Sequence, residues 1–117
     1  MGLWLTRADA ERVDGEIAVT EDLLQGHGIV HGGVYCAIIE TTASVGASLR
    51  VGLEHQVVGI SNRTNFRRAV TSGTLTVVAE FAAEDAPRQL WSATIHDERG
   101  RLVADGQVHL MRLGGDP

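Results

Sequence analysis

The sequence contains no lysine. Its ten cationic residues are all arginine, against 15 Asp and Glu, so the formal net charge is −5. A chain with this balance lacks the basic face that phosphate backbones require, which argues against nucleic acid as a partner. A single cysteine excludes a disulfide framework and any zinc site built from several cysteines. No apolar run approaches the ~20 residues of a membrane span and no signal peptide opens the chain, so we expect a cytoplasmic protein without a membrane partner.

The length of 117 residues and the apolar fraction of 44% predict one globular domain, residues 1–117. Residues 25–33, QGHGIVHGG, hold four glycines, which is too many for a helix and indicates a loop with unusual backbone conformations. Residues 34–50 are small and apolar with Gly46 as the only helix breaker, so they predict a buried helix. A stripe along this helix predicts close packing and consists of Cys36, Glu40, Ala43, Ser44 and Ala47.

Alternating apolar and polar residues indicate β-strands before and after this helix. The segments are 11–20, 56–68, 73–84, 89–97 and 101–112. The last two are joined by Asp97-Glu98-Arg99-Gly100, a hairpin turn with glycine where a left-handed backbone is needed. One strand, one long helix and four further strands predict an α+β fold in which an antiparallel sheet wraps around a single central helix.

Glu40 is unusual in this helix because its neighbours are small or apolar and no Arg or Lys lies one helical turn away. A buried carboxylate without a partner is costly. Burial would also raise the pKa of Glu40 toward the range that suits a base or nucleophile near neutral pH. Two structural alternatives stay open at this point: Glu40 faces solvent at the helix edge, or it pairs with an arginine from a strand.

The glycines before the helix add a second chemical element. Gly32 and Gly33 lie where the helix begins, so their N–H groups lack partners within the helix and point outward with the positive end of its dipole. Glycine also lets a substrate carbonyl approach the backbone closely. The pattern predicts an oxyanion site at the helix start, with the Glu40 carboxylate two turns further on and within reach of the same carbonyl, as acyl transfer requires.

The segment QGHGIVHGGVYCAIIETTAS resembles the signature of the hotdog-fold acyl-CoA thioesterases of the PaaI type, in which a G-x-x-H-G-G loop leads into the central helix. It is most similar to the branch with a catalytic Glu, the 4-hydroxybenzoyl-CoA and 1,4-dihydroxy-2-naphthoyl-CoA thioesterases. Five positions match that branch at fixed spacing: Gln25, His31, Gly32, Glu40 and Ser44. The resemblance implies the hotdog fold and hydrolysis of a small acyl-CoA, aromatic acyl groups included.

The resemblance also implies a role for each matched residue. Glu40 attacks the thioester carbonyl or activates a water to do so, and the Gly32 N–H polarises the carbonyl oxygen. Gln25 orients the carbonyl or the water, Ser44 hydrogen-bonds the water or Glu40, and His31 shapes the loop and contacts the thioester sulfur. Further substrate-binding positions, of which the arginines are expected near the CoA phosphates, are Gly33, Gly59, Asn62, Arg67, Arg68 and Arg88.

The same resemblance implies a homodimer, or a homotetramer of paired dimers, with the acyl-CoA at the interface between subunits. Coenzyme A is part of the substrate, and we expect no separate cofactor. We also expect no metal, because His27 and His31 have a helical metal-ligand spacing in a loop too rich in glycine to be helical. Family members usually carry an extra helix before the first strand, for which residues 1–10 leave little room.

Two other functions stay open on the same fold. Hotdog β-hydroxyacyl-thioester dehydratases use a His in a G-H-F-like loop and a Glu fourteen positions later, whereas Glu40 lies thirteen positions after His27. The Pro-Gly that begins the dehydratase helix is also replaced here. A non-catalytic acyl-CoA-binding protein is the second alternative, because a fold alone does not fix a function. The five-residue match favours hydrolysis over both.

Overall fold

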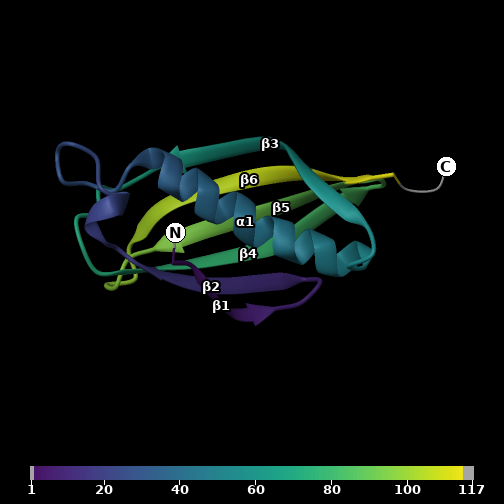
Figure 1. Ribbon diagram of the computed structural model, residues 1–117, viewed down its shortest axis with the longest axis horizontal. Coiled ribbons are helices and arrows are strands. Elements are labelled where there is room, and N and C mark those ends of the chain that lie inside the picture. The colour runs from purple at the N-terminus through teal and green to yellow at the C-terminus, as the bar shows by residue number, and fades with distance from the viewer. Residues whose placement is uncertain (1, 115–117) are drawn as a thin grey trace.

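The computed structural model describes residues 2–114, which form a six-stranded antiparallel sheet with one long helix across one face (Figure 1). The helix is α1 (Gly32–Val51), and a short 3-10 helix, η1 (Glu21–Leu23), precedes it. The strands are β1 (Trp4–Ala8), β2 (Arg12–Ala18), β3 (Gln56–Phe66), β4 (Thr74–Asp85), β5 (Arg88–His96) and β6 (Leu102–Leu113). Their order in the sheet is β1-β2-β4-β5-β6-β3. The expected α+β fold is confirmed.

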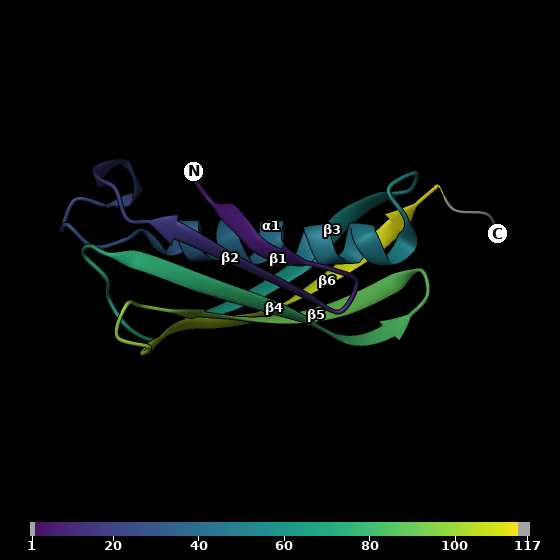
Figure 2. The same ribbon diagram turned by 90° about the horizontal axis from the view of Figure 1, so that it is seen from below.

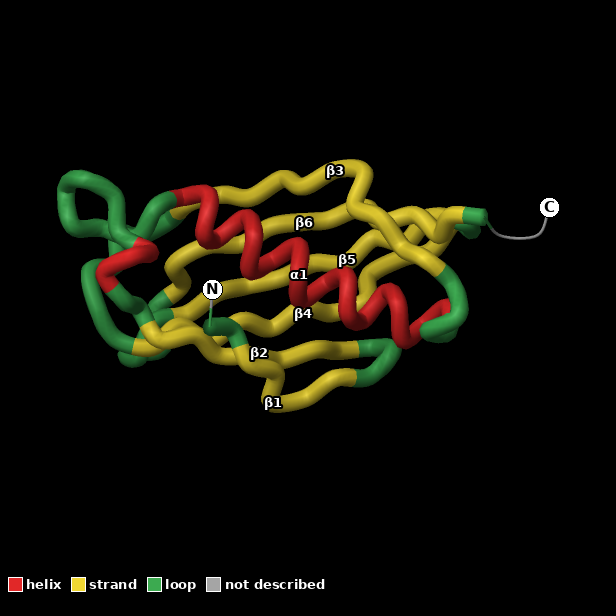
Figure 3. Tube along the Cα trace, viewed as in Figure 1, coloured by secondary structure: helices red, strands yellow, loops and turns green. Residues whose placement is uncertain are grey.

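The helix crosses the strands obliquely, as Figure 3 shows, with β3 and β1 at the two edges of the sheet. In the view turned by 90°, the sheet curves around α1 from one side (Figure 2). Within residues 2–114, β1 and β3 each pair with a strand on one side only. Because β3 is eleven residues long and carries the exposed side chains of Ile60 and Phe66, it is an open edge of the kind that proteins usually cover.

Five strands and the hairpin turn agree with the sequence analysis to within a few residues. Gly100 has a φ of 76°, and its N–H donates to the Asp97 carbonyl at 2.9 Å, so the expected left-handed turn is confirmed. The strand β1 was not expected. All five of its residues are exposed, so no alternation of buried and exposed side chains marks it in the sequence. It pairs with β2 through a bulge between Leu5 and Arg7.

The face of α1 that meets the sheet is built for close approach. A Cβ placed at Gly46 would lie 2.2 Å from Cη2 of Trp91, which is fully buried on β5. The expected stripe of small residues divides here: Ala43 and Ala47 are buried against the sheet, whereas Glu40 is exposed beside the edge strand β3. Although α1 has 20 residues, no helix among those described is apolar enough over sufficient length to span a bilayer.

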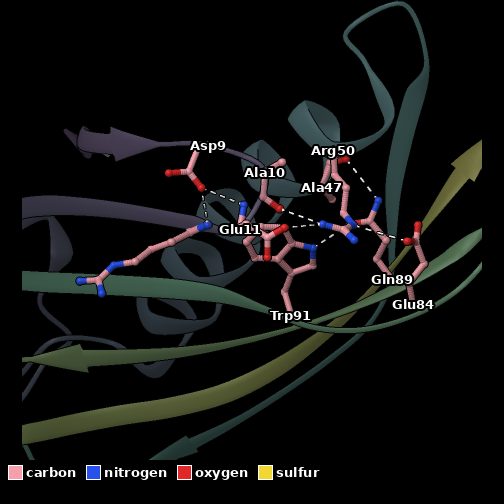
Figure 4. Close-up of polar contacts among 9 residues, drawn as sticks. Asp9, Ala10, Glu11, Ala47, Arg50, Glu84, Gln89 and Trp91 are labelled. Atoms are coloured by element: carbon pink, nitrogen blue, oxygen red, sulfur yellow. Dashed lines mark hydrogen bonds and ion pairs between the residues drawn. The ribbon is translucent and has the colours of Figure 1, made fainter.

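Polar contacts fasten the C-terminal half of α1 to the sheet (Figure 4). The Trp91 Nε1 donates to Gln89 Oε1 at 2.8 Å, and Gln89 Nε2 donates to the Ala47 carbonyl at 3.3 Å. One turn further on, Arg50 pairs with Glu11 at 3.0 Å and with Glu84 at 3.4 Å. These contacts fix the rotation of α1, and with it the residues on the face that points away from the sheet.

Candidate active site

The start of α1 is capped by a side chain. His31 is the N-cap residue, with φ −65° and ψ 135°, and its Nδ1 accepts a hydrogen bond from the Gly33 N–H at 2.9 Å. An accepting Nδ1 carries no proton, so the ring is held with its hydrogen on Nε2. Of the two donors expected at the helix start, the Gly33 N–H is therefore occupied. The Gly32 N–H has no protein acceptor among the described residues, as expected for an oxyanion donor.

The loop before the helix places Gln25 beside Gly32. The Gln25 N–H donates to the Ile29 carbonyl at 2.8 Å, and Gly28, at a φ of 75°, donates to the Gln25 carbonyl at 2.9 Å. This tight turn leaves the Gln25 side chain exposed at the rim of a hollow of about 370 Å³. The other residues that line this hollow include Gly32, Tyr35, Phe66, Arg67 and Arg68.

Tyr35 is a residue of this hollow that the sequence analysis missed. Its side chain is buried, its hydroxyl has no hydrogen-bond partner among the described residues, and burial raises the pKa of the phenol. The centroid of its ring is 6.1 Å from that of Phe66. The only signal in the sequence is one tyrosine, about a turn after Gly32, in a helix with no other aromatic residue.

Glu40 lies in a second and larger hollow, a groove of about 740 Å³ along the outer face of α1. In the single chain Glu40 is exposed at the edge of the sheet beside β3, which is one of the two structural alternatives that the sequence left open. The groove is mostly apolar, and the residues lining it include Cys36, Ser44, Leu49, Leu53 and Asn62. None of the ion pairs among residues 2–114 involves Glu40.

Two residues of β3 fit closely against the Glu40 carboxylate. The Asn62 Nδ2 donates to the Cys36 carbonyl at 3.0 Å and reaches Glu40 Oε1 at 3.4 Å. A Cβ placed at Gly59 would lie 3.0 Å from Glu40 Oε2, so the missing side chain there gives the carboxylate room. Ser44 follows one helical turn after Glu40 and lines the same groove. Of the expected site residues, these four are brought together.

The donor at the helix start and the carboxylate are not brought together within one chain. Gly32 and Glu40 are eight residues apart on α1, which at 1.5 Å per residue is about 12 Å along the axis. The hollow that contains Gly32 and the groove that contains Glu40 share no residue. Within one chain, a carbonyl at the Gly32 N–H is therefore about two helical turns from Glu40, and the expectation that one carbonyl meets both groups stays a prediction.

Of the three arginines expected near CoA phosphates, Arg67 and Arg68 line the hollow at the helix start and Arg88 lies elsewhere. Arg67 is paired with Asp105 at 2.8 Å, and this hydrogen bond lowers the pKa of the Asp105 carboxyl and raises that of Arg67. Arg68 lines the hollow at the helix start and has no carboxylate within 4 Å among the described residues. Arg88 begins β5 opposite Met111, at the end of the sheet near the C-terminus of α1. Only Arg68 is both near the hollow and unpaired.

No group of three or more His, Cys, Asp or Glu side chains within residues 2–114 is placed to hold a metal ion. The chemistry available is that of a carboxylate in an apolar groove and of backbone and side-chain donors at a helix start.

The sequence profile of the thioesterase superfamily matches residues 27–104 of this chain. The chain belongs to the thioesterase superfamily.

This thioesterase is similar to several known proteins. It is 40% identical over 120 residues to a Mycobacterium tuberculosis protein named as an esterase without a stated substrate, a match covering 100% of this chain and 86% of that protein. The solved structure of the M. tuberculosis protein superposes with a TM-score of 0.93 at 41% identity, covering 99% of this chain and 94% of that one.

A solved Haemophilus influenzae thioesterase has a TM-score of 0.88 at 26% identity, covering 95% of this chain and 78% of that one. A Listeria monocytogenes protein named 1,4-dihydroxy-2-naphthoyl-CoA hydrolase is 27% identical over 103 residues, covering 88% of this chain and 84% of that protein. The family and these relatives identify the protein as a thioester hydrolase with the hotdog fold.

Proposed function

We propose that the protein hydrolyses the CoA thioester of a small acyl group, aromatic groups included, and that Glu40 acts on the thioester carbonyl. The observation that carries this proposal is a carboxylate with no cationic partner among residues 2–114, in an apolar groove large enough for an acyl group. The water oxygen forms a bond to the carbonyl carbon and the C–S bond breaks, which gives the free acid and the CoA thiol. Glu40 either attacks the carbonyl itself or takes the proton of the attacking water.

The proposal includes a homodimer whose site is shared between subunits. Because about 12 Å of helix separates Gly32 from Glu40, one carbonyl meets both groups only if they come from different protomers. Pairing along the open edge strand β3 would cover Ile60 and Phe66 and bring two copies of α1 side by side. The Gly32 N–H and Gln25 of one protomer would then face Glu40 and Ser44 of its partner, and two such dimers could assemble further.

The catalytic claim is tested by thiol release from benzoyl-CoA, hexanoyl-CoA and an acyl-carrier-protein thioester. Glu40→Gln keeps the side-chain volume, and we expect its kcat to fall at least ~10³-fold, the scale for loss of a base or nucleophile while binding remains. Glu80→Gln is the matched control, because Glu80 is exposed on the sheet face away from α1. Turnover by Glu40→Gln within a few-fold of wild type would refute the assignment.

The donor claim needs a change that removes the Gly32 N–H. Gly32 is the first helical residue, a position that accepts proline, and His31 already has the extended backbone that precedes proline. Gly32→Pro deletes the N–H, and we expect kcat to fall about 10²- to 10³-fold. Gly32→Ala is the control for added bulk, because it keeps the N–H while its Cβ would lie 2.9 Å from the end of the exposed Phe66 ring. Equal losses in both variants would show that space, and not the donor, matters.

The shared site is tested by mixing the two defects. Glu40→Gln and Gly32→Pro homodimers should each be inactive, whereas a heterodimer has one site with both defects and one intact site. Random pairing gives half heterodimers, so co-expression should restore about a quarter of wild-type activity. Sedimentation should give twice the chain mass of 12.5 kDa, or a multiple of that. An active 12.5 kDa species, or no complementation, would refute the shared site.

A further inference from the structure

A chain of hydrogen bonds reaches the Glu40 carboxylate from β3. The Thr64 Oγ1 donates to Asn62 Oδ1 at 2.7 Å, and Asn62 Nδ2 donates to the Cys36 carbonyl at 3.0 Å and toward Glu40 Oε1 at 3.4 Å. Thr64 and Asn62 are two residues apart on a strand, so their side chains lie on the same face of the sheet, the one that carries α1. Both side chains are half-buried, whereas their neighbours on β3 are exposed.

The direction of the Asn62 amide is set by the helix, and its position is held by Thr64. An asparagine amide has nearly the same shape in its two flipped orientations, and only its partners decide between them. The Cys36 carbonyl can only accept, so the Asn62 nitrogen faces the helix. In the flipped orientation the amide oxygen would face the Cys36 carbonyl and the Glu40 carboxylate, which are both acceptors. In the orientation that results, the Thr64 hydroxyl donates to the amide oxygen and holds the amide beside Glu40.

Glu40 has no other hydrogen-bond donor within residues 2–114. Its second oxygen, Oε2, lies against Gly59 of β3. Because glycine has no side chain, the strand leaves room for this oxygen and offers it no side-chain donor. The orientation of the carboxylate in the groove thus depends on a single long hydrogen bond. A reacting group displaced by about 1 Å can lose about two orders of magnitude in rate, so a weak but directed contact of this kind matters for turnover.

We propose that Thr64 and Asn62 are positioning residues that orient the Glu40 carboxylate for attack on the thioester, with Thr64 acting through Asn62. This inference rests on the proposed function and extends it. It gives Asn62 a different role from the substrate contact that the sequence analysis expected, and it adds a residue, Thr64, that no motif indicated. Neither residue takes part in bond making.

The kinetic test uses the hydroxyl alone. Thr64→Val keeps the shape of the side chain and removes the donor, so we expect kcat to fall about tenfold or more while KM changes less than twofold. Thr64→Ser keeps the hydroxyl and should restore kcat to within about threefold of wild type. Thr76→Val is the matched control, because Thr76 is an exposed strand threonine without a side-chain hydrogen bond among the described residues. Wild-type kcat in Thr64→Val, or no rescue by serine, would overturn the proposal.

A second readout does not need activity. The chain has two asparagines, Asn62 and Asn65, so labelling asparagine with ¹⁵N gives two side-chain amide pairs in an NMR spectrum. Glu40→Gln should shift the Asn62 pair and not that of Asn65, which donates to Asp105. Thr64→Val should shift or broaden the same pair. If the wild type hydrolyses no thioester, the proposed function fails. The chemical shifts of the Asn62 amide then still test whether Asn62 contacts Glu40. An unmoved Asn62 pair in both variants would refute it.

Discussion

Gly46→Ala sets two known effects against each other at the centre of α1. Alanine has a higher helix propensity than glycine by about 1 kcal/mol, so the change should stabilise an isolated helix. In the folded protein the new Cβ would lie 2.2, 2.5 and 2.8 Å from three carbon atoms of the Trp91 ring. These distances are far below van der Waals contact, which begins near ~3.5 Å. Helix and ring must therefore separate by more than about 1 Å.

The Trp91 ring has little freedom to move away. It is fully buried, and its Nε1 is held by Gln89, which is itself tied to the Ala47 carbonyl on the same helix. Overpacking a close-packed core costs about 1–3 kcal/mol, and a clash with a fixed ring belongs at the upper end. Subtracting the propensity gain of about 1 kcal/mol leaves a net loss of about 2 kcal/mol. For a chain of this size that corresponds to a decrease of about 8 °C in Tm.

The assay is urea unfolding at a fixed protein concentration, since association would otherwise change the apparent stability. Ala37→Gly on the exposed face of α1 measures the effect of helix propensity alone. It should lower the free energy of unfolding by about 1 kcal/mol. In a Trp91→Leu background, Gly46→Ala should cost much less than in the wild type, because the smaller side chain makes room. A Gly46→Ala protein as stable as wild type, or the same cost in both backgrounds, would refute the packing argument.

Three further substitutions test single contacts. Tyr35→Phe should leave the free energy of unfolding unchanged or raise it by about 1 kcal/mol, because it removes a buried hydroxyl without a partner; a clear loss in urea unfolding would mean that the hydroxyl is bonded. His31→Ala should cost about 1 kcal/mol through loss of the N-cap bond, and His31→Asn, which can accept the same bond, should cost less; equal losses would contradict the capping role. The pKa of Asp97 is lowered below its ordinary value of 3.8, chiefly by the hydrogen bond from the Arg101 N–H. The charged Asp97 therefore stabilises the fold at pH values above 3.8, and this stabilisation is lost as the pH falls through the pKa of the folded state. The stability difference between wild type and Asp97→Asn should therefore be constant above about pH 5 and shrink below about pH 4, and a difference independent of pH would contradict this.

Local sequence patterns were sufficient for most of the fold. The glycine loop of residues 25–33, the helix that follows it and the turn at Gly100 each depend on backbone preferences of a few adjacent residues. The five strands with alternating side chains were found for the same reason, because apolar and polar residues alternate along their sequences. The strand β1 was missed because its pairing with β2 comes from edge hydrogen bonds and leaves every one of its side chains exposed.

The site shows where local patterns stop being informative. The sequence analysis correctly placed Gly32 and Glu40 on one helix. It did not take into account that two turns of this helix separate the two groups by more than one carbonyl spans. The exposure of Glu40 depends on which face of α1 meets the sheet, and the buried ring of Trp91 against Gly46 helps to decide that. The contacts of Asn62 with the helix join residues 22 and 26 positions apart, where no periodicity applies.

The sequence by itself determined the elements of this protein and the residue types that carry its chemistry: a capped, glycine-led helix with a carboxylate on one stripe, and strands enough to surround it. Only the tertiary structure decided which stripe faces solvent, and that the donor and the carboxylate open into separate hollows. The physical reason is range. Backbone preferences act over a few residues, whereas the rotation of a helix and the meeting of side chains are fixed by packing between segments distant in the chain.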